Sequence, residues 1–176
     1  MNRVAVIGSG GAGKSTFARE LGAKTGIPVI HLDALFWGPG WAPMPKPQWT
    51  ELERGLIAGE RWIMDGNYGS TQKLRLPRAD TVVFLDIPRL VCVWAVIRRW
   101  ATYRRRGRPD MRPENNDKLE LEFLRWIWTY PSLKRPEVLA RLAALPPSTR
   151  VVRLRSRREI RQFLEGVAPA GEAATA

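Results

Sequence analysis

Cysteine and histidine are almost absent from this sequence, which contains one residue of each. A single cysteine, Cys92, cannot form an intramolecular disulfide or a multi-cysteine metal site. Because Cys92 lies in an apolar run, we expect a buried structural thiol. The longest apolar run, residues 90–97, is too short for a membrane span and is followed at once by arginines. Residues 1–3 lead straight into a strand pattern rather than a secretory signal, so we expect a cytoplasmic protein.

Acidic residues are also scarce relative to basic ones. The 176 residues include 17 Asp and Glu against 29 Lys and Arg, which gives a net charge of +12. The excess is mostly arginine, gathered in residues 98–112 and 150–161. A basic surface attracts phosphates of every kind, so this charge predicts an anionic partner without identifying it. A high-GC coding bias would also enrich arginine.

The chain length and composition suit one globular domain. Hydrophobic residues make up 44% and charged residues 26% of the sequence. Apolar, β-branched runs predict five strands, at residues 4–7, 29–32, 62–64, 81–85 and 150–154. Helical patterns are predicted between and after them, at residues 15–24, 48–58, 91–100, 117–130 and 158–164. We interpret residues 34–47, which are rich in Gly, Pro and Trp, as a loop.

Alternating strands and helices predict a three-layer α/β/α fold with a five-stranded parallel sheet. This P-loop NTPase domain is expected to cover residues 1–166, followed by a disordered tail at residues 167–176. Right-handed crossovers place the carboxyl ends of all strands on one edge, where open α/β sheets bind ligands. Gly8, Asp33, Asp65 and Asp86 each follow a strand and are therefore expected to converge there.

The strongest local signal is a complete P-loop pattern directly after the first strand. The residues expected to bind the nucleotide are Gly8, Ser9, Gly10, Gly11, Ala12, Gly13, Lys14, Ser15 and Thr16. Glycines let backbone amides point at phosphates in front of a helix N-terminus. Lys14 would reach the β- and γ-phosphates of ATP or GTP, and Ser15 would hold Mg²⁺.

Two strand-end carboxylates compete as further Mg²⁺ ligands. Asp86 follows Thr-Val-Val-Phe-Leu and is placed as a Walker B carboxylate, and Asp65 is the alternative. Either aspartate could instead cap a helix or form a turn.

Missing motifs narrow the class of P-loop protein. The sequence has no Asn/Thr-Lys-x-Asp guanine-specificity motif and no Leu-Ser-Gly-Gly-Gln signature of transporter ATPases, and it is too short for an AAA+ module. A small kinase remains, similar to nucleoside monophosphate and shikimate kinases. More specific stretches are residues 31–37, 39–41, 62–68 with Thr71, Arg75 and Leu76, then 84–89 and 108–111. Together, over about residues 3–165, they resemble the adenylate-kinase-like "DNA topology modulation protein" family.

The resemblance implies an ATP-dependent phosphotransferase with a five-stranded core. Asp65-Gly66 matches the start of the Asp-Gly-Phe-Pro-Arg segment of adenylate kinases. Asn67-Tyr68 departs from it, so the arginine that grips the AMP phosphate is missing, and Arg75 or Arg78 is the candidate replacement. The family label describes a cellular effect and does not establish contact with DNA.

The resemblance also implies an acceptor site and an arginine lid. Asp33 is placed where shikimate-type kinases carry an acidic residue for the acceptor hydroxyl, and it could accept a proton or simply cap the loop. An Arg-rich lid is expected near residues 98–113, with Arg104 and Arg108 contacting the transferred phosphoryl group. Arg157 lies where related kinases hold the adenine ring. Most lid arginines could equally form a solvated helix face.

Aromatic residues and the lone histidine have two interpretations each. Trp37, Trp41 and Trp49 could form a wall for a planar acceptor or the core of the proline-rich loop. His31 alternates within its strand, which is more typical of a structural residue than of a base.

Three functions are consistent with the sequence. The first is a kinase that transfers the γ-phosphoryl group of Mg-ATP to a small acceptor, nucleotide-like or hydroxyl-bearing. The alternative is a nucleic-acid-associated ATPase or regulator that affects DNA topology, although the sequence shows no helix-turn-helix, zinc finger or RNA-recognition motif. The third is a nucleotide-binding switch without efficient chemistry.

Overall fold

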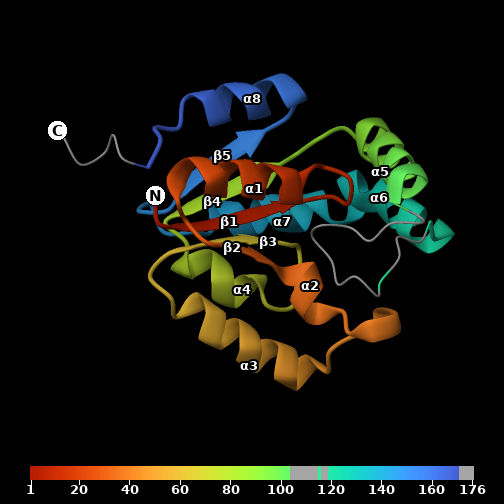
Figure 1. Ribbon diagram of the computed structural model, residues 1–176, viewed down its shortest axis with the longest axis horizontal. Helices are drawn as coiled ribbons and strands as arrows, with labels where there is room; N and C mark the ends of the chain where they lie inside the picture. The colour runs from red at the N-terminus through yellow and green to blue at the C-terminus, as the bar shows by residue number, and fades with distance from the viewer. Residues whose placement is uncertain (104–114, 116–118, 171–176) are drawn as a thin grey trace.

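The computed structural model describes residues 1–103, 115 and 119–170. Its centre is one parallel sheet with the strand order β2-β3-β1-β4-β5 (Figure 1). The strands are β1 (Arg3–Gly8), β2 (Val29–His31), β3 (Trp62–Asp65), β4 (Thr81–Leu85) and β5 (Arg150–Leu154). All five predicted strands are confirmed, and β1 lies in the middle of the sheet with β3 and β4 on either side.

Helices cover both faces of this sheet (Figure 1). In the described residues they are α1 (Lys14–Thr25), α2 (Leu32–Phe36), α3 (Lys46–Ile57), α4 (Gln72–Arg75), α5 (Arg89–Tyr103), α6 (Leu121–Leu133), α7 (Arg135–Ala143) and α8 (Arg157–Glu165). With the P-loop pattern between β1 and α1, this arrangement is the three-layer α/β/α fold with a five-stranded parallel sheet that the sequence predicts.

The two faces of β1 divide the apolar core into two halves, because successive side chains of a strand point to opposite sides. Val4 and Val6 face the side packed with α1, α5, α6 and α8. Ala5 and Ile7 face the side packed with α3, α4 and α7. Every one of these β1 side chains is fully buried, so β1 holds the P-loop on a rigid base.

The segment predicted as a loop at residues 34–47 is only partly irregular. Residues 34–36 complete α2, Pro39–Trp41 forms a 3-10 turn, and α3 already begins at Lys46. Proline at the second position of α3 is compatible with a helix start, because the amide it lacks has no partner within the first turn. The high Gly and Pro content therefore reflects helix ends rather than a continuous loop.

The sequence patterns predict no helix at residues 135–143, where the structure has α7. Leu121, Leu124 and Trp128 have the spacing of one helix face, yet Leu121 and Trp128 are 84% and 46% exposed. The residues of α6 that are buried are Ile127 and Tyr130. Spacing alone identifies a helix face but cannot show which side meets the sheet.

The end of the described chain extends the folded unit beyond residue 166. Val167 packs against the core, and the Ala170 N–H donates to the Lys24 carbonyl at 2.7 Å. Two residues of the expected tail thus contact the domain, and residues 171–176 lie outside the described part. No helix within the described residues combines the length and apolar character that crossing a membrane requires.

Candidate active site

The P-loop joins the end of β1 to the start of α1. Gly11 and Gly13 have φ angles of 74° and 94°, which L-residues with side chains rarely adopt. A side chain at Gly13 would collide with the guanidinium of Arg157, and one at Gly11 with the Cys92 carbonyl. The loop therefore exposes backbone in front of the α1 N-terminus, and the first turn of α1 contains no acidic residue. This cradle fits a phosphate chain.

The side chain of Lys14 folds back over this loop. Its Nζ donates to the Ser9 carbonyl at 3.0 Å. Burial lowers the pKa of Lys14, whereas the nearby carboxylates of Asp33 and Asp65 act in the opposite direction. Lys14 is thus a partly buried cation placed between the P-loop and two carboxylates.

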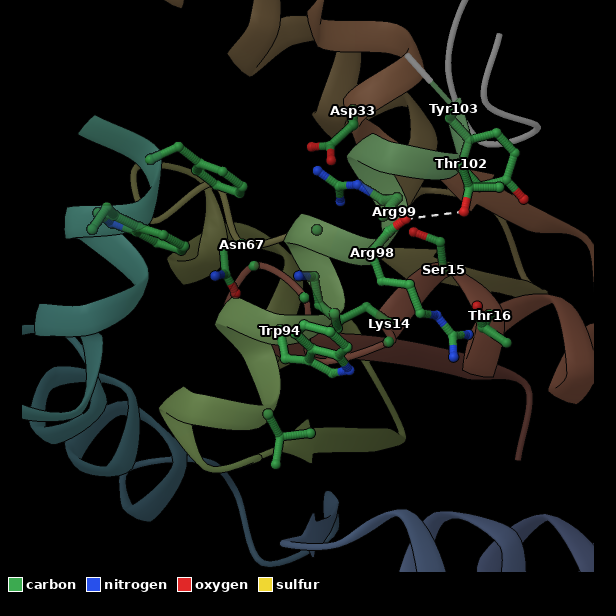
Figure 2. Close-up of a pocket in the computed structure, with 18 of the residues that line it drawn as sticks. Lys14, Ser15, Thr16, Asp33, Asn67, Trp94, Arg98, Arg99, Thr102 and Tyr103 are labelled. Atoms are coloured by element: carbon green, nitrogen blue, oxygen red, sulfur yellow. Dashed lines mark hydrogen bonds between the residues drawn. The ribbon is translucent and has the colours of Figure 1, made fainter. Parts of the chain in front are cut away.

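A cleft of about 980 Å³ opens in front of the P-loop (Figure 2). Of the predicted nucleotide-binding residues, the ones that line it are Gly10, Gly11, Gly13, Lys14, Ser15, Thr16 and Arg157. Ser9 and Ala12 are buried, and together with Gly8 they form the underside of the loop. The cleft is within the size range of cofactor and ligand pockets.

Basic side chains line much of this cleft. They come from three helices and are Lys14, Arg19, Arg98, Arg99 and Arg157. Figure 2 shows Arg98, Arg99, Thr102 and Tyr103 reaching from α5 toward the part of the cleft that holds Ser15, Thr16 and Asp33. This excess of positive charge favours a polyanionic ligand such as a nucleoside triphosphate.

Only the beginning of the expected arginine lid can be placed. Arg98 and Arg99 belong to α5 and line the cleft. Arg104 and Arg108, the two arginines expected to contact the phosphoryl group, lie outside the described residues. On the other side of the P-loop, Arg157 donates from Nη2 to the Gly11 carbonyl at 3.4 Å.

Asp33 lies in the first turn of α2 rather than in a loop after β2. Its Oδ1 accepts a hydrogen bond from the Tyr68 hydroxyl at 2.6 Å. Burial and the neighbouring Asp33 carboxylate raise the pKa of Tyr68 above its ordinary value, so the phenol keeps its proton and acts as the donor. Asp33 and Tyr68 both line the cleft.

Asp65, at the end of β3, pairs with the only histidine. The distance between His31 Nδ1 and Asp65 Oδ1 is 2.5 Å, and the two residues are register partners in the β2–β3 ladder. Asp65 is 5% exposed, and its charge acts on Lys14. The geometry agrees with a structural role for His31 and leaves Asp65 close to the P-loop lysine.

Asp86, the other candidate Mg²⁺ ligand, lies in different surroundings. Both of its carboxylate oxygens accept from Arg135, at 2.9 and 3.1 Å, and Oδ2 also accepts from Arg153, at 2.6 and 2.9 Å. Asp86 does not line the cleft. Two guanidinium groups satisfy this carboxylate, so the geometry argues against the Walker B role expected for Asp86 and favours an ion-paired anchor.

The aromatic residues of the 34–49 segment divide between the two interpretations. Trp37 and Trp41 line the cleft. Trp49 is 2% exposed, donates from Nε1 to Thr71 Oγ1 at 3.2 Å, and belongs to the core. Further aromatic walls of the cleft come from Trp94 on α5 and from the stacked pair Phe123 and Trp126 on α6, whose roles were not predicted.

Arg75, a candidate residue for binding an acceptor phosphate, is buried inside the protein. It is fully buried, and its Nη1 pairs with the equally buried Glu53 at 2.5 Å. Its Nη2 donates to the Gly66 and Asn67 carbonyls at 2.9 and 3.3 Å. Arg75 therefore supports the chain after β3 and does not reach a ligand, while Arg78 is exposed and does not line the cleft.

The lone cysteine has the environment that the sequence predicts. Cys92 is fully buried, and burial raises its pKa to about 11. Its sulfur donates weakly to the Ile87 carbonyl at 3.6 Å. Within the described residues, His, Cys, Asp and Glu form no group of three that could hold a metal ion.

The structural role of Asn67 was not predicted from the sequence. Its amide oxygen accepts from the Gly8 N–H at 3.1 Å, and its amide nitrogen donates to the Gly8 carbonyl at 2.6 Å. The one signal in the sequence was the departure of Asn67-Tyr68 from the adenylate-kinase segment.

Comparison with known proteins identifies similar solved structures. A sugar kinase from Janibacter sp. HTCC2649 is 18% identical, with 94% of this chain and 91% of that one covered and a TM-score of 0.49. Shikimate kinase from Bacteroides thetaiotaomicron is 19% identical, with 93% and 94% covered and a TM-score of 0.49. Deoxyadenosine kinase from M. mycoides with bound dCTP is 13% identical, with 92% and 96% covered and a TM-score of 0.49.

No protein-family model and no curated protein matches the chain. Membership of the "DNA topology modulation protein" family therefore stays an expectation from the sequence. At these identities and TM-scores, the solved structures identify no substrate for this chain.

Proposed function

We propose that this protein is a phosphotransferase that moves the γ-phosphoryl group of ATP to a small acceptor. The observation that carries the proposal is the arrangement around Lys14. The P-loop cradle, the arginines of α5 and the Asp33 carboxylate open into the same cleft. This combination provides a place for phosphates next to a group that can accept a proton.

The donor side is built from the P-loop and α5. Backbone amides at the start of α1 would bind the phosphates, and Lys14 would exchange its bond to the Ser9 carbonyl for one to a phosphate oxygen. Arg98 and Arg99 would offset charge on the transferred group. We propose that Arg157, beside Gly11 and Gly13, lies near the nucleotide base.

Mg²⁺ fits the donor side through oxygen ligands. When bound, Mg²⁺ would offset the negative charge of the phosphates. Ser15 presents its hydroxyl at the cleft, and Asp65 lies near enough to act on the charge of Lys14. We retain Ser15 and Asp65 as the residues that would hold the ion, directly or through water.

On the acceptor side, Asp33 favours a hydroxyl over a phosphate as the attacking group. The hydroxyl oxygen would form a bond to the γ-phosphorus, its proton would pass to the Asp33 carboxylate, and the bond to the ADP oxygen would break. Arg75 is sealed against Glu53, so a dedicated phosphate grip for a nucleoside monophosphate is missing at this position. Trp37 and Trp41 would pack against the acceptor.

The nucleic-acid hypothesis has less structural support. Two arginines of the basic C-terminal half, Arg135 and Arg153, are paired with Asp86. Arg98 and Arg99, from the first basic stretch, line the cleft.

The test is a transfer assay with ATP labelled on the γ-phosphate and Mg²⁺. Acceptors would be nucleosides, sugars, shikimate-like hydroxy acids and nucleoside monophosphates, with double-stranded DNA as a separate arm. A labelled alcohol is the expected product. Label released only to water, stimulated by DNA and by no small molecule, would overturn the proposal in favour of a nucleic-acid-dependent ATPase.

A further inference from the structure

The chain that leaves β3 lines the cleft with Gly66, Asn67 and Tyr68. The Gly66 N–H still donates to the Val6 carbonyl at 3.2 Å, which continues the ladder between β3 and β1. At Tyr68 the backbone turns away with a φ of 31°, an unusual value for a residue with a side chain. Two residues beyond Val6 on β1, Gly8 is bound by a side chain of this segment.

The side chain of Asn67 makes these contacts. Its amide both accepts from the Gly8 N–H and donates to the Gly8 carbonyl, at 3.1 and 2.6 Å. A primary amide has the donor and acceptor geometry of a peptide group, so it can hold both backbone groups of one residue. The first residue of the P-loop is thereby fixed to β3.

The next residue, Tyr68, contacts Asp33 rather than the P-loop. Its hydroxyl donates to Asp33 Oδ1 at 2.6 Å. Its ring packs against Phe36 and Trp49, with centroid distances of 4.8 Å to each. Because the ring is held on two sides, the hydroxyl can hold the Asp33 carboxylate in one orientation.

Buried polar side chains hydrogen-bond the backbone around Asn67 and Tyr68. Arg75, paired with Glu53, donates to the carbonyls of Gly66 and Asn67. Thr71 Oγ1 donates to the Tyr68 carbonyl at 3.1 Å. These three hydrogen bonds, to the carbonyls of Gly66, Asn67 and Tyr68, hold the unusual backbone conformation at Tyr68. Strained backbone that its surroundings stabilise in this way is often found at functional sites.

We infer that Asn67 and Tyr68 form a bridge that sets the position of the Asp33 carboxylate relative to the P-loop. They act as positioning residues: Asn67 through Gly8 on the nucleotide side, and Tyr68 through Asp33 on the acceptor side. The inference rests on the proposed function for its acceptor half. Its nucleotide half stands on the contacts to Gly8 alone.

The acceptor half is tested with Tyr68→Phe, which keeps the ring and removes the hydroxyl. We expect transfer to the acceptor to fall about tenfold in kcat, while the KM for ATP and the slow hydrolysis of ATP by water stay unchanged. In an Asp33→Asn background the same change should have no further effect, since Tyr68 acts through Asp33. An equal loss of transfer and hydrolysis, or full additivity with Asp33→Asn, would overturn this half.

The nucleotide half is tested with Asn67→Asp, which has the same shape but replaces the donor to the Gly8 carbonyl by a carboxylate oxygen. We expect the Kd of a fluorescent ATP analogue to rise about tenfold. The matched control is Asn115→Asp. The Asn115 amide is buried and clamps another turn in the same way, accepting from the Trp41 N–H at 3.2 Å and donating to the Gly38 carbonyl at 2.9 Å.

The control separates a local role of Asn67 from a general loss of stability. Asn115→Asp should leave the Kd of the analogue within twofold of the wild type, and an unchanged Kd in Asn67→Asp would overturn the bridge. If the wild-type protein phosphorylates no acceptor, the proposed function fails. The binding measurement on Asn67→Asp still decides the nucleotide half of the bridge in that case.

Discussion

The strands β3 and β4 flank β1 and both lead into an aspartate, yet the two carboxylates meet different partners. Asp65 pairs with His31 and acts on the charge of Lys14. Asp86 is held by Arg135 from α7 and Arg153 from β5. Asp65 is the register partner of Val6 on β1, whereas Asp86 follows Leu85, the partner of Gly8, and neither aspartate is among the residues that line the cleft. The first carboxylate acts on the P-loop lysine and the second holds parts of the scaffold together. What distinguishes them is which basic group the neighbouring elements bring within reach.

The largest expected effect is at the basic group on the cleft side. Lys14→Ala should lower ATP turnover by at least about a thousandfold, because a phosphate-binding cation is lost at the transferring group. Initial rates with labelled ATP measure this effect. Lys73→Ala, which removes an exposed lysine outside the cleft, is the control and should retain full turnover. Comparable turnover in Lys14→Ala would contradict the assignment of the P-loop.

A second experiment compares the aspartates directly. Asp33→Asn should lower transfer roughly a hundredfold, the usual contribution of a proton acceptor. Asp86→Asn should leave kcat near the wild-type value, because Asp86 does not line the cleft. The two variants carry the same chemical change, so kcat under saturating ATP separates the two sites. A large loss of kcat in the folded Asp86→Asn protein would restore Asp86 as a ligand of Mg²⁺.

The scaffold role of Asp86 predicts a loss of stability. Asp86→Ala leaves Arg135 and Arg153 without their shared partner in a region where Asp86 is only 10% exposed. We expect the free energy of unfolding to fall by about 2 kcal/mol, less than for a fully buried pair because both arginines are partly exposed. Urea denaturation measures the change. An unaltered midpoint would show that the two ion pairs contribute nothing to folding.

The last prediction concerns Cys92, a buried thiol whose pKa is influenced by both Lys14 and Asp86. Burial raises its pKa to about 11, Lys14 and Arg157 oppose this shift, and Asp86 adds to it. At pH 8.5 the native thiol should react with iodoacetamide roughly a hundredfold more slowly than a free cysteine. The neutral thiol also favours the folded state at low pH, so this contribution declines as the pH rises from the ordinary thiol pKa toward 11. Rapid labelling of native protein would contradict the buried position.

Much of the architecture could be predicted from the sequence because it depends on local patterns. The five strands are apolar runs of consecutive residues, and the P-loop is a contiguous motif, so neither needs knowledge of distant partners. The face of α6 and the existence of α7 were missed, since both depend on what the helices pack against. Asn67 was missed for a similar reason: its function is a contact to Gly8, which is 59 residues away.

The sequence by itself determined the parallel α/β/α fold and the position of the P-loop. Hydrophobic periodicity and the handedness of crossovers are sufficient for these features. Only the tertiary structure decided which charges face the cleft. Arg75 and Lys14 are both cations that follow a strand. Arg75 is buried and paired with Glu53, whereas Lys14 lines the cleft. The reason is that a buried charge needs a partner, and that partner is supplied by a different part of the chain.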